Sequence, residues 1–159
     1  MGILRTLPLL AVFGAALSGC DQGPNSDPPH PAIPSRYSPG GEYSFTGRPG
    51  DPQPRFLVLH VDSHPTLGNI IHVRLSGIAI KNPQAPQGVA DRVEHLPIAE
   101  ASLDNSGPKL IRTGSPLPEF IDTYMLWRKP FDQGKAGIWS KPLAECIDAL
   151  ELGLNGGKK

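Results

Sequence analysis

The stretch RFLVLHVDSHPTLGNIIHVRLSGIAI, residues 55–80, decides the fold. Residues 55–62 and 69–80 are rich in Val, Ile, Leu and Phe, and their side chains fall on two faces with the two-residue period of a β-strand. Pro65 and Gly68 lie between the two segments and favour a wide loop. The stretch therefore predicts a β-hairpin.

Shorter segments surround this hairpin. Residues 42–47 alternate apolar and polar side chains and predict a first strand at an edge of the sheet. Gly77, inside the second hairpin strand, predicts a bulge or a bend. Residues 89–96 predict a short strand or an extended connection, 97–107 a short helix, and 109–113 another short strand.

Two helices are predicted near the C-terminus. Ser115 is a candidate N-cap with Pro116 in the first helical position, and an amphipathic pattern continues until Pro130 should end or kink the helix. Ser140 is a candidate cap for the second helix, whose apolar stripe includes Cys146. Strands precede helices, which is typical of an α+β fold. We expect a small antiparallel β-sheet with one face packed against these two helices.

The hairpin also holds the densest group of polar residues suited to chemistry. His60 and Asp62 lie on one face of the first strand, and His72 lies on the matching face of the second. If Asp62 pairs with Ile70, His60 lies beside His72. With His64, these side chains are a candidate set for zinc or another transition metal. The alternative is that they form only the polar face of a hairpin.

Other signals of function are few. The sequence has no nucleophile elbow, phosphate loop, dinucleotide fingerprint or paired-cysteine motif, so an enzyme is less expected than a binding protein. The charges balance, with 15 Lys and Arg against 15 Asp and Glu. No basic cluster is present, so nucleic acid is not an expected partner.

The N-terminus begins MGILRTLPLLAVFGAALSGC, in which Arg5 precedes an uncharged apolar stretch and small residues lead to Cys20. This is the layout of a secretory signal peptide, residues 1–19. The tetrapeptide LSGC resembles the lipobox of bacterial lipoproteins. That resemblance implies cleavage before Cys20, lipidation of its thiol, and palmitate or a similar acyl chain on the new amine. Two or three acyl chains anchor a protein stably to a membrane.

The resemblance also implies a location. A lipidated chain would be anchored in the cell envelope and face the periplasm, and Asp21 resembles the signal that retains lipoproteins in the inner membrane. Residues 20–41 are rich in Pro and Gly and predict a tether without a core of its own. One globular domain, 42–154, and a short tail, 155–159, follow. Cys146 is then the one remaining cysteine, and an unpaired thiol in an oxidising compartment should be buried.

Three functions remain open. The first is a lipid-anchored, non-enzymatic module that binds another envelope protein, with Trp127 and Trp139 as candidate contacts. The second is a metal-binding protein that uses the hairpin histidines. The third is a lipoprotein that binds a small ligand between sheet and helices.

The lipobox makes a direct prediction. The variant Cys20→Ser should remain unlipidated and uncleaved, because it lacks the thiol that accepts the lipid. Labelling cells with radioactive palmitate checks this, with the wild-type chain as control. Incorporation of label by the variant would overturn the assignment.

Overall fold

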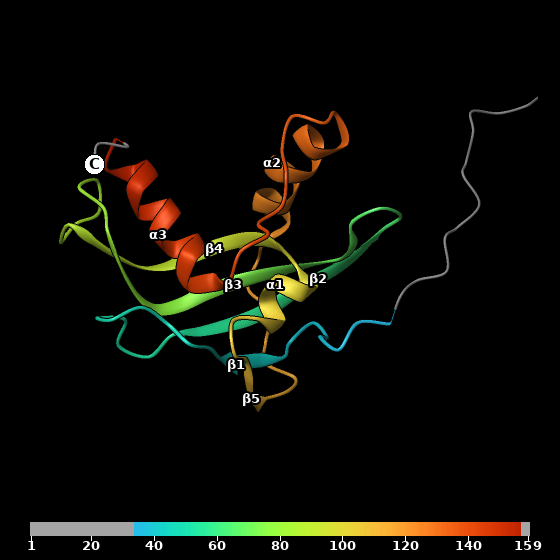
Figure 1. Cartoon of the computed structure of the whole chain (residues 1–159), viewed down its shortest axis with the longest axis horizontal. Helices are drawn as coiled ribbons and strands as arrows, with labels where there is room; N and C mark the ends of the chain where they lie inside the picture. The colour runs from blue at the N-terminus through green and yellow to red at the C-terminus, as the bar shows by residue number, and fades with distance from the viewer. Residues whose placement is uncertain (1–33, 157–159) are drawn as a thin grey trace, which may run out of the picture. The chain divides into compact units, whose positions relative to one another are not determined.

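The structure is a computed structural model that describes residues 34–156 (Figure 1). The signal peptide, Cys20 and Asp21 lie outside the described residues. The described chain forms a five-stranded antiparallel sheet in the order β4-β3-β2-β1-β5 together with three helices, as expected for an α+β fold. The elements are β1 (Glu42–Ser44), β2 (Arg55–His64), β3 (Gly68–Lys81), β4 (Val89–Ala99), α1 (Glu100–Asp104), β5 (Lys109–Arg112), α2 (Ile121–Asp132) and α3 (Leu143–Leu154).

The hairpin prediction is confirmed, and the structure has the register that places His60 beside His72. Asp62 of β2 pairs with Ile70 of β3, and His60 pairs with His72. The register shifts between Val58 and His60, where β2 has one residue more than β3, as in a β-bulge. On each side of this bulge, paired residues of β2 and β3 point to the same face of the sheet. The expectation that residues 42–47 form an edge strand is wrong, because β1 lies between β2 and β5.

One face of the sheet carries the apolar core. Val73 and its same-face neighbours on β3 pack with Leu103 of α1 and with Leu143 and Ile147 of α3. In Figure 1 both α1 and α3 lie in front of the sheet. Cys146 is fully buried in this cluster, as expected, and burial raises the pKa of its thiol to about 11. Cys146 is therefore a small core residue at neutral pH.

Helix α2 covers the opposite face of the sheet. Neighbouring residues of a strand point to opposite faces, so His72 points away from the core that Val73 joins. The rings of Tyr124 and Trp127 in α2 contact His72, with centroids 5.2 and 4.8 Å from that of its ring. The expectation that both helices pack on one face is therefore wrong, and the sheet is sandwiched between α3 and α2.

The start of α2 also differs from expectation. The helix begins at Ile121, and residues 116–120 have no regular secondary structure. A residue before proline disfavours helical backbone angles, and Leu117 precedes Pro118, so a helix cannot begin at Pro116. Pro130 lies inside the last turn of α2 and does not end it. Within residues 34–156, no helix has the length and apolarity of a membrane span.

The domain begins upstream of Glu42. Tyr37, which we expected in the tether, is only 3% exposed and packs edge-on against Tyr43 and Phe56. Its hydroxyl donates a 2.6 Å hydrogen bond to Asp104. An aromatic side chain buried with its hydroxyl satisfied contributes strongly to a core, so residues 34–41 belong to the folded domain.

Gly77 lies at a position in β3 where the backbone requires glycine. Its φ is +65°, and a Cβ atom there would lie 1.9 Å from the backbone oxygen of Gln53. The pairing of β3 with β4 is irregular between Ser76 and Ile80, which confirms the predicted bulge. Only glycine tolerates both the left-handed angle and this close approach.

The variant Gly77→Ala should lose about 2 kcal/mol or more of stability, because it combines backbone strain with a clash against main chain. Gly68→Ala is the matched control: its φ is +73°, but no atom lies within 4 Å of the added Cβ. That control should lose only about 1 kcal/mol. Urea unfolding of both variants checks the difference, and equal losses would contradict it.

Candidate functional site

The polar centre of the domain is the carboxylate of Asp62, whose side chain is 16% exposed. The two imidazoles of the hairpin donate to it. His60 Nε2 lies 3.1 Å from Oδ1, and His72 Nε2 lies 3.1 Å from Oδ2. Because an ionised carboxylate only accepts hydrogen bonds, both of these ring nitrogens carry a hydrogen.

The chain of hydrogen bonds continues from β3 to β4. Nδ1 of His72 lies 2.8 Å from Nε2 of His95, and the two ring planes are 4° apart. One hydrogen lies between these nitrogens, so Asp62, His72 and His95 are joined in a continuous line across three strands. His72 is fully buried, and both of its nitrogens have partners.

Helix α2 completes the cluster from above the sheet. The hydroxyl of Tyr124 donates to Asp62 Oδ2 at 3.1 Å, and Arg128 Nη1 donates to the same oxygen at 3.3 Å. Trp127 packs its ring edge-on against His72. We call Asp62, His60, His72, His95, Tyr124 and Arg128 the Asp62 cluster.

The surroundings shift the pKa of two members. Burial would raise the pKa of the Asp62 carboxyl, but the hydrogen bonds from His72 and Tyr124 and the charges nearby hold it well below its usual range. Burial, with a contribution from the neighbouring His72, lowers the pKa of His95 to about 4. At neutral pH Asp62 is therefore charged and His95 is neutral.

Sequence reasoning found part of this cluster. The structure brings His60, Asp62 and His72 together, because Asp62 pairs with Ile70 as the metal hypothesis required. His64 lies apart from this group at the end of β2, where its Nδ1 accepts from the backbone N–H groups of Thr66 and Leu67. His95 was missed because residues 89–96 were assigned no facing partner.

The arrangement differs from that of a metal centre. The atoms that would bind an ion are hydrogen-bonded to one another, and His64 is absent from the group. Within residues 34–156, no set of three or more His, Cys, Asp or Glu side chains has the arrangement needed to hold a metal ion. The cluster contains no Ser, Thr or Cys side chain. Its hydrogen bonds join α2 to the sheet.

The two candidate contact residues are both packed against the domain. Trp127 stacks on Phe131 with ring centroids 4.5 Å apart, and its indole N–H donates to the carbonyl of Gly137 at 2.9 Å. Trp139 forms a parallel bridge with Ile98 and packs against the core. Both indole rings therefore make most of their contacts within the domain.

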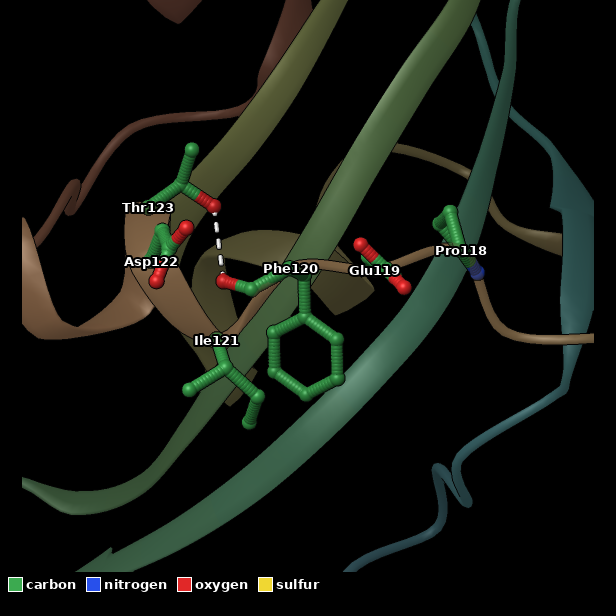
Figure 2. A pocket seen from close by; sticks show the side chains of 6 residues that line it. All are labelled: Pro118, Glu119, Phe120, Ile121, Asp122 and Thr123. Atoms are coloured by element: carbon green, nitrogen blue, oxygen red, sulfur yellow. Dashed lines mark hydrogen bonds between the residues drawn. The ribbon is translucent and has the colours of Figure 1, made fainter.

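A hollow of about 540 Å³ lies at the start of α2, where Figure 2 shows Phe120 and Ile121 side by side. It is lined by the consecutive residues 118–123. The hydroxyl of Thr123 donates back to the carbonyl of Phe120 at 2.8 Å and closes the first turn. The hollow is thus a feature of the helix start and is not the pocket between sheet and helices that a ligand-binding lipoprotein would use.

Comparison of the chain with protein-family models, curated proteins and solved structures gives no match. The functional argument therefore rests on the residues themselves.

The position of His95 predicts a pH dependence of stability. Between pH 6.5 and about 4 the unfolded chain binds a proton at His95 that the folded chain does not bind. Stability should therefore fall as the pH falls through this window. In the variant His95→Gln, the free energy of unfolding should depend less steeply on pH. The slope should fall by an amount that corresponds to at most one bound proton. Urea unfolding at several pH values measures it, and an unchanged slope in the variant would contradict the half-buried, neutral state of His95.

Proposed function

We propose that this chain is a lipid-anchored protein of the cell envelope whose domain is a non-enzymatic module that binds another envelope protein. The observation that carries the binding role is the outward face of α2. There Leu126 is 77% exposed and Ile121 is 62% exposed, and Met125 is 38% exposed. We call these three residues the α2 apolar face.

The spacing of these residues supports a single contact surface. Ile121 and Met125 are four residues apart and so lie on the same side of the helix, with Leu126 next to them. Exposed apolar side chains that gather on one helix are typical of sites that bind proteins. A groove on the partner could accept such a helix face.

The inward face of α2 supports the same proposal. None of the twelve described residues of α2 is fully buried, so its attachment depends on the Asp62 cluster and on the packing of Trp127. These contacts come from Tyr124, Trp127 and Arg128, which leaves the α2 apolar face free. A binding surface held on a fixed element loses less conformational entropy when a partner docks.

The envelope location is supported by the lipobox at Cys20 and by Asp21 after it. The 13 residues from Asp21 to Ile33 would span about 40 Å as an extended chain. That distance is enough to hold the domain clear of the membrane surface, where a partner could reach α2. The inner membrane, with the domain on its periplasmic side, is the location that Asp21 favours.

The metal-binding and ligand-binding alternatives have less support. The candidate metal ligands His60, Asp62 and His72 are engaged with each other and with α2. The α2 apolar face has no such use within the domain.

A photo-crosslinking residue placed at Leu126 of the full chain tests the proposal in intact cells. We expect one defined cross-linked partner protein, lost when Met125→Glu is added, because a charge would disrupt an apolar contact. Both side chains are exposed, so the melting temperature should change little. The matched control is Leu152, which is 42% exposed on α3.

Three outcomes would count against the proposal. They are no product at Leu126, the same products at Leu126 and Leu152, and a product that contains only a second copy of this chain. The last would make the α2 apolar face a self-association surface.

A further inference from the structure

The α2 side of the sheet has a second half that α2 leaves open. Arg74 lies on this face because it is two residues from His72 along β3. Ser76 follows it on the same face and pairs with Arg55 of β2 on one side and with Arg92 of β4 on the other. Arginine side chains from three neighbouring strands therefore gather on one surface.

A hollow of about 260 Å³ lies at this place. Arg74 and Arg92 line it from the sheet, and Arg112 lines it from the edge strand β5. The hydroxyl-bearing residues Ser76 and Ser115 also line it, the latter from the non-helical segment that leads to α2. The walls thus supply three guanidinium groups and two hydroxyls.

One carboxylate, that of Glu42, also lines the hollow, and it is already neutralised. Arg112 Nε lies 2.6 Å from one of its oxygens and Arg55 Nη1 lies 3.5 Å from the other. Glu42 also accepts from the hydroxyl of Ser115 at 3.5 Å, so its oxygens are engaged at its own side of the hollow. Arg74 and Arg92 pair with carboxylates other than Glu42.

The present partners of Arg74 and Arg92 are weak competitors. Arg74 pairs with Glu94, whose side chain is 54% exposed, and Arg92 pairs with Asp91, whose side chain is 73% exposed. Exposed ion pairs of this kind contribute about 0–1 kcal/mol each. Each guanidinium has five N–H donors in a fixed fork, so it can bind a second oxyanion without losing the first.

We propose that this hollow is a binding site for the oxyanion group of a small molecule, a carboxylate or a phosphate, held by Arg74 and Arg92 with the hydroxyl of Ser76. Forked guanidinium groups recognise both oxyanions through paired hydrogen bonds. The volume is just below the usual range of about 300–1,000 Å³ for ligand pockets, so the ligand is small. The site is separate from the α2 apolar face and does not depend on the proposed protein-binding role.

Titration calorimetry on the full chain tests this site with inorganic phosphate and with succinate as probes at constant ionic strength. We expect binding of at least one probe, and the probe that binds more tightly identifies phosphate or carboxylate as the preferred group. The double variant Arg74→Gln/Arg92→Gln should weaken that binding about tenfold or more, because it removes the charged donors. The variant Arg74→Lys/Arg92→Lys keeps the positive charges but loses the forked guanidinium groups. Its affinity for the probe should lie between that of the wild-type chain and that of the double glutamine variant.

Arg36→Gln is the matched control, since Arg36 is exposed, pairs with Asp104 and lies outside the hollow. It should leave binding unchanged. The proposal is overturned if neither probe binds the wild-type chain. It is also overturned if one Arg36→Gln change weakens binding as much as the double variant, since the effect would then be net charge alone. Melting temperatures of all variants confirm that each remains folded.

Discussion

The charge of Asp62 is the constraint on which the arrangement of this domain depends. A carboxylate that is 16% exposed loses most of its hydration, and that loss must be offset by donors inside the protein. Asp62 obtains them from three elements: His60 of its own strand, His72 of β3, and Tyr124 and Arg128 of α2. Asp62 therefore links helix α2 to strands β2 and β3.

This constraint divides the two faces of the sheet between different kinds of interaction. On one face α1 and α3 bury an apolar core that contains Val73, Leu143 and Cys146. On the other face α2 is held mainly by hydrogen bonds and aromatic edges, with its apolar side chains turned outward. A helix held in this way can present a hydrophobic surface without giving up its place on the sheet.

The non-helical segment before α2 has a related consequence. Pro116 and Pro118 keep residues 116–120 out of a helix, so this segment joins edge strand β5 to α2 on the opposite side of the sheet from the core. Ser115, where the segment begins, hydrogen-bonds through its backbone N–H to Gly40 and lines the arginine hollow. Helix α2 covers one half of this face of the sheet, and the other half, which holds the arginine hollow, stays open.

Local sequence patterns predicted the features that depend on one or two neighbouring segments. The two-residue period and the Pro65–Gly68 loop were enough to predict the hairpin, and the apolar stripe around Cys146 predicted its burial. The pairing of His60 with His72 followed only if Asp62 paired with Ile70, and a shift of one residue would have separated the two histidines. Gly77 marked the bulge correctly. These features follow from side-chain period and from the special backbone freedom of glycine.

Features that depend on distant contacts were not predicted. Nothing near His95 in the sequence indicates that it will face His72, because that contact needs the β3–β4 register. Tyr37 lies in a proline-rich segment, and its burial depends on Tyr43, Phe56 and Asp104. The placement of α2 on the face opposite α3 depends on where α2 begins, and two prolines moved that start by several residues.

Hydrogen exchange in the variant Asp62→Asn tests the central role of this carboxylate most directly. The substitution keeps the shape of the side chain and removes the charge that Arg128 and Tyr124 of α2 bind. We expect the backbone amides of residues 121–132 to exchange at least tenfold faster, because α2 loses the cluster that holds it, while the central amides of β2 and β3 stay protected. Unchanged protection of α2, or an equal loss across the whole sheet, would contradict the claim that Asp62 fastens this helix.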